Sequence, residues 1–442
     1  MMKFEAWATS ENRKPLVVQG ARQVGKTWLI KEFGNSHYRQ VAYISFMDDE
    51  NMKSVFDGSL APSRLLEAIS IATNCDAGSP DVLVVLDEVQ ECPRALTSLK
   101  MFCEQRPEVP LIAAGSLLGV ALHQGAPYPV GKVDYLDMYP MTFVEFLLAT
   151  GESGLARLVE SCDFELMAGF SEKLTSALRH YYFVGGMPEA VAAFGKGANF
   201  DAARIVQLRL LRDYEHDFSK YASPELTEKI RLVWRSAPSQ LARENKKFIY
   251  SAVRSGARAR GYEEAIQWLV DAGLLLKVSR ITKPGLPLLG YEDKDAFKLY
   301  LLDVGLLGAA SSLDKSTLIE GSGLFTEFKG ALTENYVCQA LYATRVIRPY
   351  YWSADKSTGE VDFVYDFKNT IVPVEVKAEE NLKAKSLRSF VESNCLNCGV
   401  RLSLSGYREQ SWMVNIPLYS ANALPEKAYK IMVSQTQANP TR

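Results

Sequence analysis

Long apolar runs, histidines and excess charge are all scarce in this sequence of 442 residues, which holds four histidines and seven cysteines. No run approaches the roughly 18 apolar residues of a transmembrane helix, and the N-terminus has no apolar segment typical of a secretory signal. The cysteines are odd in number and scattered, and the CxxC pair Cys395 and Cys398 has no second pair at zinc-site spacing. These absences predict a cytoplasmic protein with no membrane partner.

Charge is also nearly balanced, with a formal net charge of −2, so the whole chain does not have the basic character of a nucleic-acid-binding protein. One segment departs from this balance. Residues 226–300 hold 14 Lys and Arg against 8 Asp and Glu, a local charge of 14 − 8 = +6. A surface that binds DNA is expected in this segment.

Four short apolar runs dominate the first 150 residues and alternate with helical patterns, at residues 15–19, 41–46, 82–86 and 110–114. Near-continuous apolar runs of this length are typical of parallel strands covered on both faces by helices. The predicted fold class is therefore α/β, with a parallel-sheet ATPase core over residues 1–160.

The remaining chain, which contains no internal repeat or low-complexity linker, changes pattern twice. Residues 161–235 are mostly helical and polar, and predict a helical lid. Residues 236–318 contain an amphipathic helix that ends near Gly273, a strand at 274–281 and a returning strand at 296–301. A helix followed by a β-hairpin outlines a winged-helix domain, and residues 319–442 form a separate α/β C-terminal domain.

The clearest motif follows the first apolar run and has the form G-x-x-x-x-G-K-[ST]. In such a loop the backbone N–H groups surround phosphate, the lysine reaches the β- and γ-phosphates, and the hydroxyl ligates Mg²⁺. The predicted cofactors are therefore ATP and Mg²⁺. The predicted nucleotide-binding residues are Gly20, Ala21, Arg22, Gln23, Val24, Gly25, Lys26, Thr27 and Trp28.

An acidic pair directly follows the third apolar run. Asp87 is placed to hold Mg²⁺ together with Thr27, and Glu88 to orient the attacking water. Ser116 follows the fourth run and should emerge at the same carboxyl edge of the sheet. There it would sense the γ-phosphate, or it would simply cap a helix. With Lys26, Glu88 and Ser116 are the candidate catalytic residues of the ATPase.

An arginine that completes the ATPase site cannot be chosen from the sequence, since Arg22, Arg94, Arg179 and Arg212 are equivalent candidates.

A second group of acids lies near the C-terminus. Glu375 and Lys377 share one face of a predicted strand, Asp362 lies on the preceding strand, and Glu334 lies on a helix before it. Two carboxylates and a lysine that converge in this way could bind a second divalent metal at Asp362 and Glu375 and cleave a phosphodiester. A solvated salt-bridge face on a hairpin explains the same pattern.

Together these motifs resemble a known family nearly end to end: the bacterial and archaeal AAA-type ATPases with a C-terminal domain of unknown function, DUF4143. The resemblance runs through residues 20–27, 86–90, 113–119, 139–146, 185–189, 297–305, 329–335, 359–363 and 373–377.

This resemblance implies an AAA+ ATPase module, a winged-helix segment and a C-terminal domain of the restriction-endonuclease-like fold. In the D…(D/E)xK pattern of that fold the matching positions are Asp362, Glu375 and Lys377, with Glu334 as the helix acid. Intact residues at these positions do not establish that the domain cleaves DNA.

Three functions follow from these patterns. The first is an ATP-driven enzyme that acts on DNA through the winged helix and the nuclease-like domain. The second is a nucleotide-dependent regulatory switch whose C-terminal module is catalytically inactive, and the third is a remodeller of proteins. DNA is the expected partner besides ATP, and the sequence allows an oligomer without indicating one.

Overall fold

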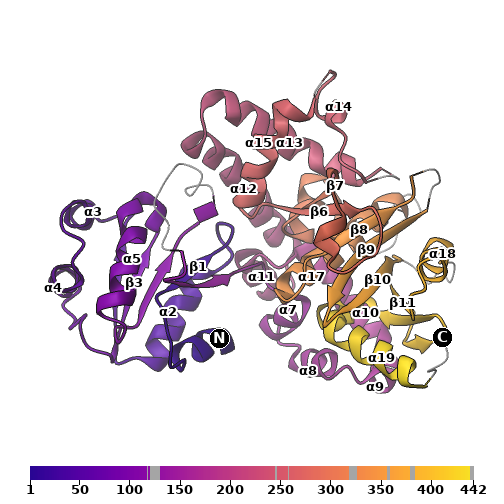
Figure 1. Ribbon diagram of the computed structural model, residues 1–442, viewed down its shortest axis with the longest axis horizontal. Coiled ribbons are helices and arrows are strands. Elements are labelled where there is room, and N and C mark those ends of the chain that lie inside the picture. The colour runs from indigo at the N-terminus through magenta and orange to yellow at the C-terminus, as the bar shows by residue number, and fades with distance from the viewer. Residues whose placement is uncertain are drawn as a thin grey trace. The chain divides into compact units, whose positions relative to one another are not determined.

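The computed structural model describes residues 1–116, 118–119, 130–243, 246–256, 258–317, 326–355, 359–378 and 384–438 (Figure 1). The chain divides into two compact units, residues 1–139 with 271–273, and residues 140–270 with 274–442. Four segments were expected from the sequence. The first unit ends at residue 139 instead of 160, and the three later segments share the second unit.

A five-stranded parallel sheet forms the centre of the first unit, in the order β2-β3-β4-β1-β5. Its strands are β1 (Leu16–Gln19), β2 (Gln40–Ser45), β3 (Val82–Asp87), β4 (Leu111–Ala114) and β5 (Asp134–Asp137). The first four coincide with the predicted apolar runs, so the parallel α/β sheet is confirmed. In this order β4 lies between β1, which leads into the P-loop, and β3, which leads into the acidic pair.

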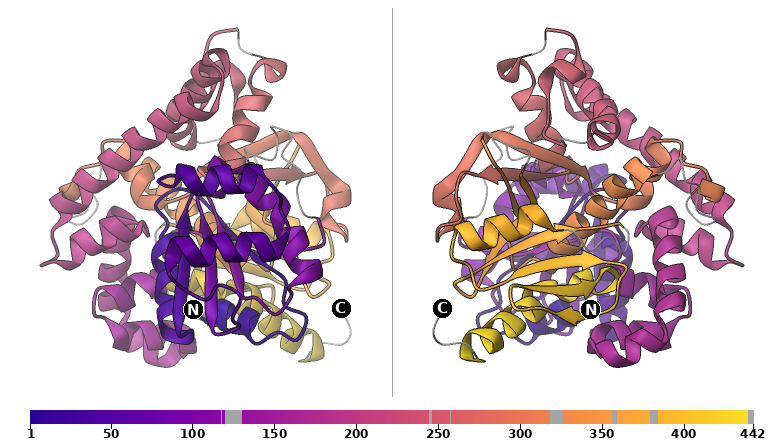
Figure 2. Two further views of the ribbon diagram at one scale, coloured as in Figure 1. Left: turned by 90° about the vertical axis from the view of Figure 1, so that its left-hand side faces the viewer. Right: turned by 90° about the vertical axis from the view of Figure 1, so that its right-hand side faces the viewer.

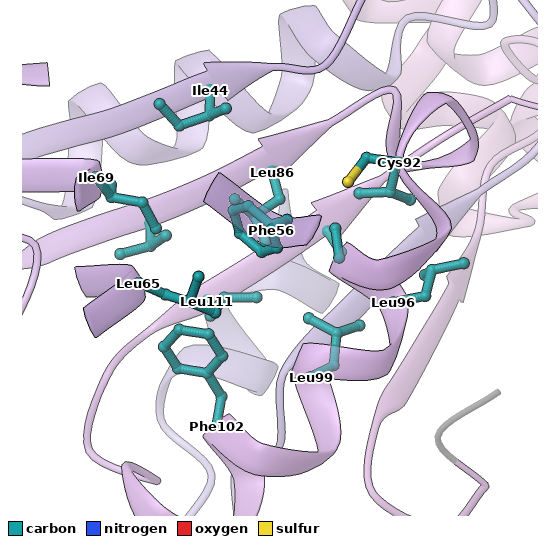
Figure 3. Close-up of a cluster of buried hydrophobic side chains, with 14 of the residues drawn as sticks. Ile44, Phe56, Leu65, Ile69, Leu86, Cys92, Leu96, Leu99, Phe102 and Leu111 are labelled. Carbon is teal, nitrogen blue, oxygen red and sulfur yellow. The ribbon is translucent and has the colours of Figure 1, made fainter. Parts of the chain in front are cut away.

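Helices cover both faces of this sheet. One face packs against α1 (Met2–Ala8) and α2 (Lys26–His37), through the buried side chains of Phe4 and Phe33. The other face packs against α3 (Glu50–Asp57), α4 (Pro62–Thr73) and α5 (Pro93–Gln105). Figure 3 shows Phe56, Leu65 and Phe102 from these three helices gathered around strand residues such as Leu86 and Leu111. Burial of both faces explains why the strands are apolar throughout.

Helices make up the first part of the second unit, as predicted. They begin at local signals in the sequence: Thr142 and Glu145 form a capping box at the start of α7, and proline opens α11 and α13. The helices are α7 (Phe143–Ala149), α8 (Ser153–Ser161), α9 (Phe164–Gly169), α10 (Ser171–Val184), α11 (Pro188–Gly195), α12 (Phe200–Tyr221), α13 (Pro224–Leu241), α14 (Tyr250–Val253) and α15 (Ala259–Asp271). A further helix, α16 (Val304–Ala310), lies later in the chain, after residue 301.

An eight-stranded mixed sheet forms the rest of the second unit, in the order β12-β13-β11-β10-β9-β8-β6-β7. Its orange and yellow strands face the viewer in the right-hand view of Figure 2. The strands are β6 (Leu275–Ile281), β7 (Glu292–Leu301), β8 (Tyr350–Ser353), β9 (Glu360–Phe367), β10 (Thr370–Val376), β11 (Gly399–Ser403), β12 (Arg408–Glu409) and β13 (Met413–Pro417).

The hairpin predicted for a winged helix is present as β6 and β7, preceded by α15. It is not a separate wing, however, because β6 pairs in parallel with β8, where Arg280 and Ile281 lie opposite Tyr351 and Trp352. The segments predicted as a winged helix and as the C-terminal domain therefore share one sheet.

Three helices accompany the C-terminal strands: α17 (Thr326–Thr344), α18 (Lys385–Ser393) and α19 (Leu424–Ala438). Leu387 and Phe390 of α18 pack into a buried cluster with Val361 and Val364 of β9. The hairpin β9–β10 turns at Lys368 and Asn369, as predicted, with φ angles of +48° and +63°. In the part of the chain that the structure describes, no helix has the length and apolarity to cross a bilayer.

Candidate functional site

The predicted phosphate loop connects the end of β1 to the start of α2. Gly20 has a φ of +145° and a Cβ there would lie 2.2 Å from the carbonyl oxygen of Met138. Gly25 has a φ of +93° and is the N-cap of α2. Both positions require glycine, and the turn leaves the N-terminal N–H groups of α2 for an anion.

Lys26 is the first residue of α2, and its side chain folds back over the loop. The Nζ donates hydrogen bonds to the carbonyl oxygens of Gly20, at 3.0 Å, and Ala21, at 2.8 Å. The residue is only 7% exposed, and this burial lowers the pKa of Lys26 to about 8 although Glu88 and Asp87 partly offset it. A buried ammonium held by neutral carbonyls is well placed to exchange them for phosphate oxygens.

Asp87 ends β3 and is 2% exposed. Its Oδ2 accepts hydrogen bonds from the hydroxyl of Thr27, at 2.7 Å, and from the hydroxyl of Tyr43 on β2, also at 2.7 Å. Its Oδ1 accepts from the N–H of Glu88 at 2.9 Å. The Thr27 hydroxyl and the Asp87 carboxylate are thus adjacent oxygen donors of the kind that Mg²⁺ prefers, and this donor set fits the metal.

Glu88 follows Asp87 with a left-handed φ of +54°. Its Oε2 accepts hydrogen bonds from the side-chain amide of Gln90 and, at 3.4 Å, from the hydroxyl of Ser116. The Ser116 hydroxyl accepts in turn from Nε of Arg22 at 3.3 Å. The structure thus brings the predicted residues of the P-loop, the acidic pair and the strand between them into one connected network.

Other sequence candidates lie elsewhere. Trp28 is 69% exposed on α2. Arg94 donates to the carbonyl oxygens of Phe56 and Gly58, both at 2.7 Å. Arg179 and Arg212 are exposed on α10 and α12 of the second unit. The positions of these arginines do not identify one of them as the arginine finger, so the choice among the predicted candidates stays open.

The four C-terminal candidates gather on the second unit. Glu334 of α17 and Glu375 of β10 are each 6% exposed. Asp362 lies on β9, the strand paired with β10, and its charge interacts with both of these carboxylates. Asp362 accepts a hydrogen bond from the N–H of Val376 at 2.7 Å. Lys377 pairs with Glu375 at 2.5 Å. The structure thus brings the four predicted residues into one cluster of interacting charges.

Two further lysines, which were not predicted at this site from the sequence, join this cluster. Lys246 forms an ion pair with Glu334, and the fully buried Lys298 of β7 pairs with Glu360 and lies 3.9 Å from Glu334. These cations outweigh burial and lower the pKa of Glu334. Asp362 shows the opposite shift: burial first, then Glu334 and Glu375, raise its pKa well above the usual range, and Lys298 and Lys246 offset this only in part.

Glu375 gives the observation that bears on a second metal. Burial raises its pKa, Lys377 partly offsets this, and its Oε2 is buried without a hydrogen-bond partner. An unpartnered carboxylate oxygen next to Asp362 fits a divalent cation. Within the described ranges, however, no three His, Cys, Asp or Glu side chains are close enough to hold a metal ion. The fit is thus limited to Asp362 and Glu375.

Comparison with protein families identifies three segments. Residues 12–147 match an AAA domain, residues 175–317 match a domain of unknown function, DUF8612, and residues 329–419 match the domain of unknown function DUF4143. The chain carries an N-terminal AAA domain and a C-terminal DUF4143 domain. The AAA domain holds the P-loop and the acidic pair, so the chain is an ATPase of the AAA/P-loop type.

Solved structures give more distant similarities to this AAA–DUF4143 chain. A Walker-type ATPase of Pyrococcus abyssi is 13% identical, with 70% of this chain and 94% of that chain covered and a TM-score of 0.44. The Orc1 protein of Aeropyrum pernix in complex with DNA is 12% identical (70% and 89% covered, TM-score 0.26). Cdc6p of Pyrobaculum aerophilum is 10% identical (69% and 88% covered, TM-score 0.23). No curated protein matches the chain.

Tyr43, Gln90, Lys246 and Lys298 are the site residues that sequence reasoning missed. Tyr43 lies one strand away from the acidic pair it contacts, and Lys246 lies 88 positions from its partner Glu334. Gln90 alone had a usable signal, because a polar residue two positions after an acid can reach back to it across a tight turn.

Proposed function

We propose that the AAA domain binds ATP·Mg²⁺ and hydrolyses ATP, with Lys26 on the phosphates, Thr27 and Asp87 on the metal, and Glu88 as the residue that orients the attacking water. The observation that carries this proposal is the 2.7 Å hydrogen bond between the Thr27 hydroxyl and the Asp87 carboxylate. When bound, Mg²⁺ offsets the charge that develops on the transferred phosphoryl group.

Glu88 is the proposed general base that acts on the attacking water. Its carboxylate is held by Gln90 and Ser116 at the carboxyl edge of the sheet, beside the loop that carries Lys26. From there it can accept a proton from water as the γ-phosphoryl group departs. Ser116 is held between Glu88 and Arg22, and this supports contact with the γ-phosphate over a role as a helix cap.

Two substitutions test the site. Lys26→Ala should weaken ATP binding by roughly 10- to 100-fold, since a charge-assisted hydrogen bond contributes about 1.5–3 kcal/mol. Glu88→Gln should keep ATP binding but slow turnover by about 100-fold or more. Glu32→Gln, an exposed change on α2, serves as the control. If Glu88→Gln and wild type hydrolyse ATP at equal rates, the role assigned to Glu88 is wrong.

We also propose that the protein acts on DNA, with the segment 236–318 as the duplex contact. Much of the positive charge of this segment is neutralised by acids, as in the pairs Arg280–Asp293 and Lys298–Glu360. Arg254, Arg258 and Arg260, around the start of α15, are instead exposed, and no ion pair joins them to the described residues. Exposed, unpaired arginines support a phosphate contact.

Salt-dependent binding tests this contact. Duplex DNA should bind less tightly as salt rises, and replacing all three arginines by glutamine should reduce the salt slope by up to about three units. A matched triple change of the exposed Arg157, Lys173 and Lys196 removes the same charge from the second unit. If both triple variants retain the wild-type affinity and slope, the segment is not the DNA contact.

The DUF4143 domain supports two candidate roles in this scheme. As a restriction-endonuclease-like domain, it would hold a divalent metal at Asp362 and Glu375, with Glu334 nearby and Lys377 beside the phosphate. As an inactive recognition module, it would serve a nucleotide-dependent switch, and the ion pairs of Glu334 with Lys246 and Lys298 favour this role.

Metal-dependent cleavage of duplex DNA separates these roles. Cleavage that is lost in Asp362→Ala and Lys377→Ala identifies a nuclease. An intact fold with no cleavage by the wild type, in Mg²⁺ or Mn²⁺ and with or without ATP, identifies the switch. ATPase activity stimulated by DNA supports the ATP-driven enzyme that acts on DNA, and its absence supports the switch or a protein remodeller.

A further inference from the structure

A row of polar residues crosses one face of the C-terminal sheet. Glu375 of β10 lies opposite Arg401 of β11, and Arg401 lies opposite Asn415 of β13. Paired residues of neighbouring parallel strands point to the same face of a sheet, so these three side chains lie side by side. Lys377, two residues after Glu375, points to this face as well.

Arg401 is unusual among the buried residues of this row. It is 1% exposed, and its Nε donates to the side-chain oxygen of Asn415 at 2.8 Å. Its Nη1 is buried and has no hydrogen-bond partner. Within the described ranges, no ion pair joins Arg401 to a carboxylate. A buried guanidinium is normally paired with an anion, because burial of an uncompensated charge is costly.

The neighbouring Glu375 has a buried oxygen without a hydrogen-bond partner. Its Oε1 pairs with Lys377, while its buried Oε2 accepts no hydrogen bond. The charges of Glu375 and Arg401 interact, yet no ion pair joins the two side chains. A guanidinium N–H of Arg401 and a carboxylate oxygen of Glu375 thus both lack a hydrogen-bond partner, and the two residues lie opposite each other on adjacent strands. Each such buried group requires a partner, such as an ion, a ligand or a water molecule.

We propose that Arg401, together with Lys377, binds a phosphate group of the nucleic-acid backbone beside Glu375. The proposal rests on the proposed action on DNA and names the phosphate contact of that site. A guanidinium presents parallel N–H donors that match two phosphate oxygens, and the Lys377 ammonium adds a second positive charge. Lys377 has a 31% exposed side chain and marks the solvent side of the row.

This arrangement also assigns separate tasks to the two cations of the row and to the carboxylates of Glu375 and the neighbouring Asp362. Arg401 and Lys377 would hold the anion, and Glu375 and Asp362 would keep carboxylate oxygens available for a divalent cation. Arg401 is a substrate-binding residue in this scheme, because it touches the phosphate. Asn415 is a positioning residue, because its side-chain oxygen holds Nε of Arg401 and also accepts from Ser403 at 2.7 Å.

Binding of a short duplex DNA, measured by fluorescence anisotropy in Ca²⁺ over a range of salt, tests the proposal on the full chain. Arg401→Gln should weaken binding by roughly tenfold or more and reduce the salt slope by about 0.9. Arg401→Lys keeps the charge, so it should retain the slope while binding less tightly. Arg388→Gln removes an exposed arginine of α18 and should leave affinity unchanged.

Thermal melting of each variant shows whether the buried substitution disturbs the fold. If Arg401→Gln is unfolded, Lys377→Gln decides, because its side chain is 31% exposed and its replacement disturbs the fold less than that of the buried Arg401. Inorganic phosphate should raise the melting temperature of the wild type more than that of either variant.

Three results would overturn the inference. The first is that folded Arg401→Gln, or Lys377→Gln where that variant decides, binds DNA with the wild-type affinity and salt slope. This result means that a water molecule, and not a phosphate, is the partner of Arg401 and Glu375. Equal phosphate stabilisation of wild type and variants has the same meaning. In these cases binding by the wild type leaves the proposed function intact. If the folded wild type binds no DNA at any salt, the proposed action on DNA fails as well.

Discussion

Nucleotide affinity should fall at alkaline pH because Lys26 is buried. Burial lowers the pKa of Lys26 to about 8 in the nucleotide-free loop, and only the ammonium form attracts the phosphates. At this pKa about nine-tenths of the lysine is protonated at pH 7 and about one-tenth at pH 9. ATP affinity should therefore drop roughly tenfold over this range, or about 1.4 kcal/mol, and proton uptake on binding should rise from about 0.1 at pH 7 to about 0.9 at pH 9.

Titration with a fluorescent ATP analogue at saturating Mg²⁺, in steps from pH 7 to pH 9, measures this effect. The terminal phosphate does not contribute, since its second pKa is near 6. Lys26→Arg is the control: arginine stays charged over the whole range, so its affinity, even if lower, should not change with pH. Equal wild-type affinity at pH 7 and pH 9 would refute the argument that burial sets the charge of Lys26.

Three further outcomes follow from single positions. Gly20→Ala should abolish ATP binding in a nucleotide titration, because its Cβ would meet the Met138 carbonyl oxygen at 2.2 Å and the loop must distort. Burial raises the pKa of Asp303 to about 6 despite hydrogen bonds from Gly186 and other donors. The neutral carboxyl of Asp303 therefore stabilises the second unit fully below pH 3.8, the usual pKa of an aspartate. In urea unfolding, the free energy of unfolding should fall by up to about 3 kcal/mol as the pH rises through 6. The Asp303→Asn variant should not show this fall. Thr142→Ala removes half of the capping box of α7 and should cost about 1 kcal/mol in the same assay, whereas wild-type stability would contradict the role of the cap.

Much of the first unit could be predicted because its signals are local. Four strands are continuous apolar runs, and the P-loop and acidic pair follow two of them directly, so topology alone brings both to one sheet edge. The strand β5, with the sequence Asp-Tyr-Leu-Asp, was missed because only Leu136 among its residues is buried. At an edge of the sheet, a strand needs no continuous apolar run.

The second unit was harder to predict because its key contacts join distant residues. The sequence shows the hairpin β6–β7, yet nothing local to it specifies the pairing of Arg280 with Tyr351. The same holds for Lys298, which looks like an ordinary polar position of an alternating strand but is fully buried against Glu360. Spacing gives the residues of an element, whereas the partner across the sheet depends on the assembled fold.

The pairing of β6 with β8 has a practical consequence for anyone who divides this protein. The segments matched to DUF8612 and DUF4143 are separated between β7 and β8, so a fragment cut there would break one continuous sheet. The excised DUF4143 fragment would present an unpaired edge of β8 to solvent, which is a template for aggregation. It would also lose Lys298 and leave Glu360 and Glu334 without their buried counter-charge. The two named segments are therefore expected to be expressed and inherited together, as one folding unit under two labels.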